Sequence, residues 1–274
     1  MCAALVALLI PLSARSEVLD EIPFQYREGL IWLKVAVAGM NRPLNFLLDT
    51  GSGVSVLDLR IARSLGVKLS NRRSVQGVNG QAFGYRVNDL EAASGCVALP
   101  KSVLAIDLRT LSDCCRNSVD GIVGADFFRG RIVQIDFAAC KVRLLTNCNP
   151  SLAKCETLPI KICNDAFCVP VRVAGYRPRW MRLDTGCDTA LEWVVGGVER
   201  ERVTQSSIGL SGGSNCSVRT EIQLGHMSIA SVSAGIHNRQ LFPNEAGLLG
   251  NGVLSKFRLT VDEPRSRAIF ESVQ

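Results

Sequence analysis

The tripeptide Asp-Thr-Gly occurs twice in this chain of 274 residues, at 49–51 and again at 184–186. A repeat with so long a period indicates two copies of a domain-sized unit and not a stack of short repeats. Each copy follows an apolar run, Phe46-Leu47-Leu48 in the first half and Met181 to Leu183 in the second. Such a run predicts a buried strand that holds the aspartate on a rigid support. We therefore expect two similar lobes.

The match between the halves extends beyond the tripeptides. Asp120-Gly121-Ile122-Val123-Gly124 in the first half corresponds to Ala246-Gly247-Leu248-Leu249-Gly250 in the second. Asp136 and Asp262 follow these segments at equal spacing. A single Asp-Thr-Gly is equally compatible with a surface turn, because Asp and Gly favour turns. The paired frames favour a common site to which each half contributes one aspartate.

These elements resemble the two hallmark segments of the pepsin/retropepsin-type aspartic protease family, in its single-chain, two-lobe form with short lobes. The resemblance implies an all-β fold of two similar retropepsin-like β-barrel lobes related by pseudo-twofold symmetry. Short Val, Ile and Leu runs broken by Gly, Asn and Pro agree with it, and short helices are expected at 57–65, 126–131 and 251–256. We predict an N-terminal lobe at 17–150 and a C-terminal lobe at 151–274, joined near Asn147 to Lys154.

The resemblance implies that Asp49 and Asp184 form a catalytic dyad. Two carboxyl groups about 3 Å apart cannot both ionise, so they share one proton. The ionised member activates a water that attacks a peptide carbonyl, and the protonated member supplies a proton. The predicted function is an aspartic endopeptidase. The alternative is a catalytically inactive pseudoprotease that binds peptides or acts as an inhibitor module on the same scaffold.

The residues that follow the aspartates have supporting roles. Gly51 and Gly186 allow tight turns that bring amide N–H groups close to the carboxylates. The resemblance implies that Thr50 and Thr185 hydrogen-bond across the two lobes. Ser52 offers a hydroxyl that can donate to Asp49.

Cys187 stands where the family usually has Ser or Thr. Asp184 therefore lacks a hydroxyl donor that matches Ser52, and we expect it to hold the shared proton more often than Asp49. The sequence leaves open whether Cys187 is free or bridged, for instance to Cys216.

A flap is expected in each lobe. Asn79-Gly80 between two strand-like runs is a strong hairpin signal. We expect Gly80, Phe83 and Tyr85 to belong to a flap that closes over substrate, and Gly213 to mark the corresponding hairpin of the second half. An ordinary hairpin with a core aromatic explains the same pattern equally well.

Eleven cysteines are a high number, and the ten that follow Cys2 suit disulfide bonds in an oxidising compartment. Cys163 and Cys168 are expected to pair across a hairpin. Metal binding is not expected, because no Cys-x2-Cys pair occurs, and the family resemblance calls for no cofactor. The apolar stretch Ala3 to Leu12 and the small residues before 17 predict a signal peptide at 1–16 and a secreted or periplasmic protein. A buried N-terminal segment is the alternative.

The net charge of +6 is spread along the chain. We expect the basic cluster of Arg177, Arg179 and Arg182 to lie on a solvated face. No pattern of basic and aromatic residues indicates nucleic-acid binding, and Ala3 to Leu12 is too short for stable membrane insertion. The expected partner is a peptide or protein substrate, and the expected state is a monomer with pseudo-dimeric lobes.

Overall fold

The computed structural model describes residues 17–77, 80–148, 155–195 and 217–273. The first half contains β1 (Val18–Arg27), β2 (Leu30–Val37), β3 (Leu44–Leu48), β4 (Val56–Asp58), α1 (Leu59–Ser64), β5 (Ser70–Gly77), β6 (Gly80–Val87), β7 (Ala92–Ser94), β8 (Val97–Ala98), β9 (Val103–Ile106), α2 (Arg109–Cys114), β10 (Gly121–Val123), η1 (Ala125–Phe128), β11 (Ile132–Asp136) and β12 (Lys141–Leu145).

The second half contains β13 (Cys155–Pro159), β14 (Lys161–Cys163), β15 (Ala166–Val173), β16 (Arg179–Leu183), β17 (Leu191–Val194), β18 (Ser217–Leu224), β19 (Met227–His237), β20 (Gly247–Leu249), α4 (Asn251–Leu254), β21 (Phe257–Asp262), η2 (Glu263–Arg265) and β22 (Arg267–Ser272). The fold is nearly all-β with a few short helices, as the sequence predicts.

The two halves repeat one strand arrangement. In the first, β10 lies between β3, to which it is parallel, and β4, to which it is antiparallel, and β9 continues parallel to β4. In the second, β20 lies in the same way between β16 and β17, and β19 continues parallel to β17. This repetition of an unusual mixed pattern is the structural counterpart of the doubled sequence frame. In the second half β18 also pairs with β15, which closes the strands into a barrel.

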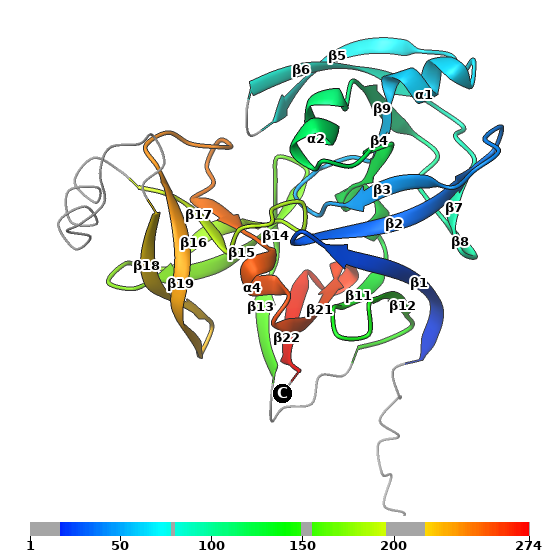
Figure 1. The fold of residues 1–274 in the computed structure, drawn as a ribbon. Helices are drawn as coiled ribbons and strands as arrows, with labels where there is room; N and C mark the ends of the chain where they lie inside the picture. Colours follow the sequence, from blue (N-terminus) through cyan, green and yellow to red (C-terminus); the bar gives the residue numbers. More distant parts are fainter. Residues whose placement is uncertain (1–16, 78–79, 149–154, 196–216, 274) are drawn as a thin grey trace, which may run out of the picture.

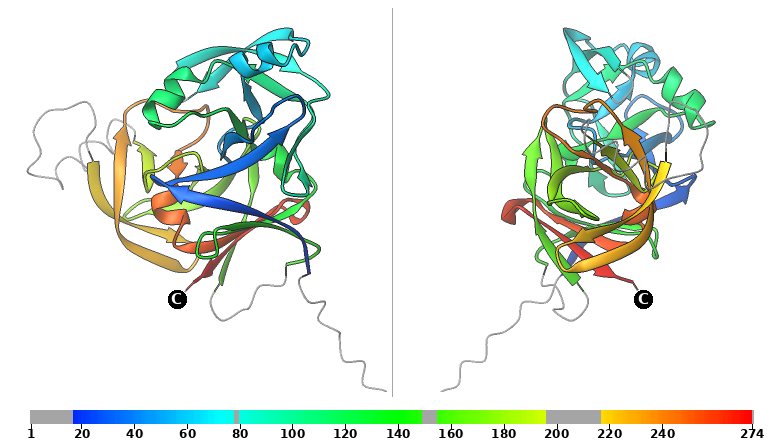
Figure 2. Two further views of the ribbon diagram at one scale, coloured as in Figure 1. Left: turned by 45° about the vertical axis from the view of Figure 1, so that its right-hand side comes forward. Right: turned by 90° about the vertical axis from the view of Figure 1, so that its left-hand side faces the viewer.

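A base sheet joins the halves. β11 of the first half pairs with β21 of the second, and the order β13-β22-β21-β11-β12-β1 is antiparallel throughout. Figure 1 shows this sheet at the bottom of the molecule and the β5–β6 hairpin at the opposite end, and both views in Figure 2 agree. The main apolar core is continuous between the halves, since buried residues of both belong to one cluster. The halves are therefore one packed body.

The expected helices occur in shortened form as α1, η1 and α4. η1 ends before Gly130, which has a positive φ of 68° that suits glycine after a helix. α2 was not expected from the sequence. None of its residues is buried and its first turn has no side-chain cap, so neither an apolar stripe nor a capping residue marks it.

Several predictions from the sequence lie outside the described residues. These are the signal peptide at 1–16, the flap residue Gly213, the suggested partner Cys216 and most of the lobe junction. The predicted domain boundaries at 150 and 151 also lie outside the described residues, and they stay predictions.

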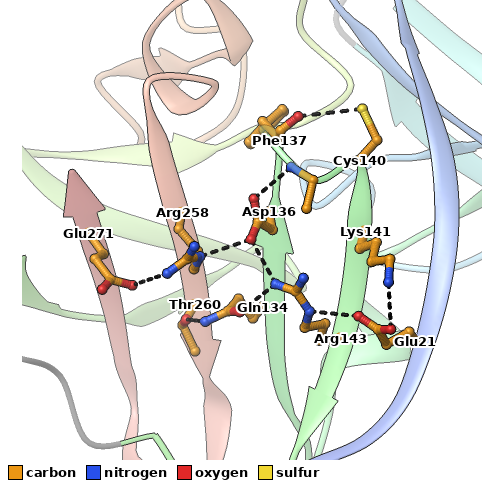
Figure 3. Close-up of polar contacts among 11 residues, drawn as sticks. Glu21, Gln134, Asp136, Phe137, Cys140, Lys141, Arg143, Arg258, Thr260 and Glu271 are labelled. Atoms are coloured by element: carbon orange, nitrogen blue, oxygen red, sulfur yellow. Dashed lines mark hydrogen bonds and ion pairs between the residues drawn. The ribbon is translucent and has the colours of Figure 1, made fainter. Parts of the chain in front are cut away.

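Asp136 is the centre of an ion-pair network on the base sheet (Figure 3). Its side chain is 3% exposed and accepts from Arg143 at 2.7 Å and from Arg258 at 3.0 Å. The network continues from Arg258 to Glu271 and from Arg143 to Glu21. Burial raises the pKa of Asp136, but the Ala139 amide and the two arginines outweigh it, so the pKa is held below its ordinary value. The network spans strands of both halves.

We predict that Asp136→Asn lowers the free energy of unfolding by about 1–3 kcal/mol near neutral pH, because it removes the charge that both arginines face. A carboxyl whose folded pKa is depressed contributes stability above its unfolded pKa, near 4, and loses that contribution as pH falls through the folded pKa. Urea unfolding of both proteins at several pH values measures the difference. It should shrink steadily below about pH 4; a difference that stays constant with pH contradicts the prediction.

Candidate active site

The strands β3 and β16 deliver the two aspartates to one place. Asp49 follows β3 and its amide donates to Val123 O at 2.9 Å; Asp184 follows β16 and its amide donates to Leu249 O at 3.0 Å. These equivalent bonds tie each aspartate to the central strand of its own half. Asp184 is 6% exposed. The two carboxyl groups are hydrogen-bonded to each other.

Two threonines join the loops that carry the aspartates. The amide of Thr50 donates to Thr185 Oγ1 at 3.0 Å, and the amide of Thr185 donates to Thr50 Oγ1 at 3.1 Å. Each hydroxyl in turn donates into the opposite half, from Thr50 to Leu183 O at 2.7 Å and from Thr185 to Leu48 O at 2.8 Å. Both side chains are fully buried. The loops are therefore held together by four reciprocal bonds with pseudo-twofold symmetry.

Each glycine of the tripeptides lies against the carboxyl of the other half. A Cβ on Gly51 would stand 2.4 Å from Asp184 Cγ, and a Cβ on Gly186 would stand 2.4 Å from Asp49 Cγ. No side chain fits at such distances. The glycines are therefore required for the approach of the two carboxyls and not only for the turn.

The two carboxylates receive different numbers of amide donors. Asp49 Oδ1 accepts from the amides of Gly51 at 2.9 Å and Ser52 at 3.0 Å. Asp184 Oδ1 accepts from the amide of Gly186 at 2.9 Å, while the Cys187 amide donates to the main-chain oxygen of Asp184 at 3.4 Å. The expectation that the Ser52 hydroxyl donates to Asp49 is wrong, because this hydroxyl donates to Val54 O at 2.8 Å. Ser52 supports Asp49 through its main chain.

Burial raises the pKa of Asp49, although the bond from Asp184, the two amides and Arg182 oppose this effect. Burial raises the pKa of Asp184 further, and the adjacent Asp49 charge adds to the rise. The second amide on the Asp49 carboxylate favours its ionised form, so the geometry favours Asp184 as the member that holds the shared proton. The sequence predicted this order from the missing hydroxyl at Cys187, whereas the structure attributes it to the additional amide on Asp49.

Cys187 is a free thiol whose Sγ lies 3.1 Å from Thr189 Oγ1. Burial raises its pKa to about 12, so it stays protonated. Its contact two residues ahead matches the bond of Ser52 to Val54, which also lies two residues ahead. The side chains at both positions thus bond to atoms of their own loops.

We expect Cys187→Ser to move neither limb of a pH–activity curve by more than about half a pH unit. The new hydroxyl should take over the contact with Thr189 Oγ1 and should not reach Asp184. Initial rates across the acidic range measure this. A shift of one unit or more to lower pH would show instead that the hydroxyl does bond the carboxyl.

The expected bridge between Cys163 and Cys168 is not formed in this structure. Both are buried free thiols that are hydrogen-bonded to each other. They lie on β14 and β15, but not opposite each other: Cys163 pairs with Ala166, and Cys168 pairs with Lys161. Residues directly opposite in an antiparallel pair are closer than those offset along the strands. The hairpin was predicted correctly, and its register places the two thiols diagonally across the strands and not directly opposite each other.

The segment expected to form the first flap is the β5–β6 hairpin, in which Gly77 pairs with Gly80. Phe83 and Tyr85 lie on one face of β6. Phe83 is 53% exposed and the Arg72 guanidinium stacks 3.8 Å from its ring centroid. The interpretation of Phe83 as a core aromatic therefore does not hold. Its contact with substrate stays a prediction.

Sequence reasoning missed a buried ion pair beside the dyad. The expectation that Arg182 is solvated is wrong: it is 2% exposed and forms a bidentate pair with Glu245. The available signal was its position in the apolar run before Asp184, where the first half has Leu47. A charge at a strand position that should be buried indicates a specific partner.

Within the described residues, His, Cys, Asp and Glu side chains nowhere form a group of three or more suited to a metal ion. Across the same residues, no helix combines the length and apolar character required to cross a membrane.

A two-lobed β fold with one aspartate from each half, locked by reciprocal threonine bonds, defines the architecture of an aspartic protease. Residues 33–127 match the aspartyl protease family. A stretch of 94 residues, 34% of this chain, is 30% identical to the retrovirus-related Pol polyprotein from transposon 412 of Drosophila melanogaster, of which it covers 7%. The fold matches the crystal structure of the aspartic proteinase from Irpex lacteus with a TM-score of 0.60 and 13% identity, over 94% of this chain and 98% of that one. Together these findings support a relation to the aspartic protease family, through the sequence of residues 33–127 and through the fold of the whole chain.

Proposed function

We propose that the protein is an active aspartic endopeptidase with Asp49 and Asp184 as its catalytic dyad. The observation that carries the proposal is the hydrogen-bonded carboxyl pair, which both halves hold at their junction. Such a pair provides a base and an acid in one site, which is what hydrolysis of a peptide bond by water requires.

In this mechanism Asp49 acts as the base, because two amides stabilise its ionised form. It removes a proton from a water bound between the carboxyls as that water attacks the peptide carbonyl. Asp184, which holds the shared proton, donates it to the substrate. The β5–β6 hairpin covers the bound peptide and excludes bulk water, with Phe83 and Tyr85 against substrate side chains.

The alternative is a pseudoprotease that binds peptides without cleaving them. The features that hold the dyad argue against it: both threonines, both glycines and the amide donors are present, and they hold the two carboxyl groups next to each other. The substitution at Cys187 was its sequence support, and the side chain at this position contacts Thr189 Oγ1.

The direct test is incubation of a denatured protein substrate with the purified chain from about pH 3 to pH 7, with and without a statine-type transition-state mimic. Cleavage that the mimic inhibits supports the proposal. Tight binding of the mimic without cleavage at any pH supports the pseudoprotease instead. We also propose a secreted or periplasmic location, which fractionation of the source cells tests.

A further inference from the structure

The Arg182–Glu245 pair connects the second half to the main chain of the first. Arg182 Nε and Nη2 donate to the two carboxylate oxygens of Glu245 at 2.7 and 2.6 Å. The remaining arm of the guanidinium, Nη1, donates to the carbonyl oxygen of Gly51 at 2.5 Å. Gly51 belongs to the loop that carries Asp49. One buried side chain of the second half thus contacts the catalytic loop of the first.

The bonded carbonyl is part of the peptide group that supports Asp49. The carbonyl of Gly51 and the amide of Ser52 belong to the same peptide unit, and that amide donates to Asp49 Oδ1 at 3.0 Å. A hydrogen bond to the oxygen of a peptide group polarises it and strengthens the bond that its N–H donates. The guanidinium, the Gly51–Ser52 peptide and the Asp49 carboxylate therefore form one hydrogen-bonded chain.

The pair is firmly positioned on its other sides. Asn164 Nδ2 donates to Glu245 Oε1 at 2.8 Å, and the Arg182 guanidinium lies 3.5 Å from the centroid of the Phe242 ring. Glu245 is 2% exposed. A buried ion pair costs desolvation energy that apolar residues would avoid, and the matching position in the first half is the apolar Leu47. A charged pair on one side only therefore suggests a function that breaks the symmetry of the dyad.

We propose that Arg182 is a positioning residue that fixes the Gly51–Ser52 peptide and so selects Asp49 as the ionised member of the pair. The inference deepens the proposed function and, for its kinetic consequences, rests on it. The two carboxyls start from nearly symmetric loops. Arg182 acts on one of them through a peptide group and on both through its charge, which lowers the pKa of Asp49 and of Asp184.

The other groups around the dyad do not supply this asymmetry. Among the described residues, the ionisable side chains near the two loops or the ion pair include Glu245, Cys187, Cys163, Cys168, Asp165, Asp188, Glu192 and Asp126. Burial raises the pKa of Cys187 and of Cys168, so these thiols stay neutral at acidic pH. Asp165 is exposed and lies 3.5 Å from Arg129. Asp188 is exposed and packs against Gly29.

The test compares the wild type with Arg182→Leu/Glu245→Leu, which removes both charges and leaves no buried ion without a partner. Carbon-13 NMR of the labelled aspartate carboxyls follows the dyad titration directly, whether or not the protein cleaves peptides. The lower of the two titration steps should rise by about one to two pH units. The acid limb of the pH profile of kcat should move to higher pH by a similar amount, while KM changes less than about threefold. The control is Arg258→Leu/Glu271→Leu, a pair on the base sheet, which should leave the titration unchanged.

A folded double variant with the titration of the wild type overturns the proposal. If the double variant does not fold, Arg182→Lys decides: it keeps the positive charge but loses the planar fork that reaches Glu245 and Gly51 together. Its lower titration step should rise by about half a unit, and an unchanged step overturns the proposal. If the titration shifts as expected in the double variant but the wild type cleaves no peptide, the proposed function is refuted and the role of Arg182 stays supported.

Discussion

Replacement of either Asp49 or Asp184 by Asn should reduce peptide cleavage by at least about a thousandfold while the fold is retained. One member of the pair must accept a proton from water as the other gives one up, and an amide does neither at acidic pH. The change is nearly isosteric, and Asn keeps an oxygen that accepts the Gly51, Ser52 or Gly186 amide. It also removes the repulsion between two buried carboxyls, so stability should not fall. Initial rates on an unfolded protein substrate measure the loss.

Asp20→Asn is the matched control for the dyad variants. Asp20 is an exposed residue of β1 on the base sheet, where its register partner is Leu144. Its replacement changes the same functional group and the same net charge but should leave the rate unaltered. Circular dichroism and urea unfolding of all three variants establish that they are folded. Cleavage by either purified dyad variant at a tenth of the wild-type rate or more would refute the mechanism.

Thr50→Val and Thr185→Val should each lower the free energy of unfolding by about 2–5 kcal/mol. Valine has nearly the same shape, but it leaves one amide and one carbonyl buried without a partner, at about 1–3 kcal/mol for each group. For Thr50 these groups are the amide of Thr185 and the carbonyl of Leu183. The loops that carry the carboxyls would also shift, and a displacement of about 1 Å can reduce activity a hundredfold. Urea denaturation and kcat/KM measure the two effects.

Thr220→Val on β18 serves as the control, because its hydroxyl donates to Glu221 O at 3.4 Å at the exposed surface. It should change stability by no more than about 0.5 kcal/mol. The pseudo-twofold symmetry of the bonds predicts that Thr50→Val and Thr185→Val lower the free energy of unfolding by similar amounts. A loss below about 0.5 kcal/mol at Thr50 would show that the cross-bonds do not hold the halves together.

The halves and their aspartates could be predicted because they depend on local patterns. Apolar runs of strand length, Asp-Thr-Gly turns and the later apolar-Gly segments are readable in the sequence, and their repetition implies equivalent structures. The all-β class, the expected helices at α1, η1 and α4, and the β14–β15 hairpin follow from the same kind of signal. α2 could not be found in this way, since it has no buried face.

The hydroxyl of Ser52 shows where local reasoning ends. The residue type offers a donor close to Asp49, yet the loop directs its hydroxyl to Val54 and its amide to the carboxylate. Which donor reaches an acceptor depends on backbone geometry to within a few tenths of an ångström, and residue identity does not specify this. The thiols of Cys163 and Cys168 are a similar case, because the strand register sets how they face each other.

The sequence by itself determined the two-lobed design and the two aspartates that meet between the lobes, since a repeated motif with repeated spacing indicates a repeated structure. Only the tertiary structure decided how the two carboxyls differ. The apolar run around Arg182 indicates that this arginine has a partner, but its buried partners Glu245 and Gly51 are far from it along the chain. Their meeting depends on how β16, the segment before β20 and the loop after β3 pack together. Electrostatic interactions act over distances in space, so a pKa is a property of the assembled fold.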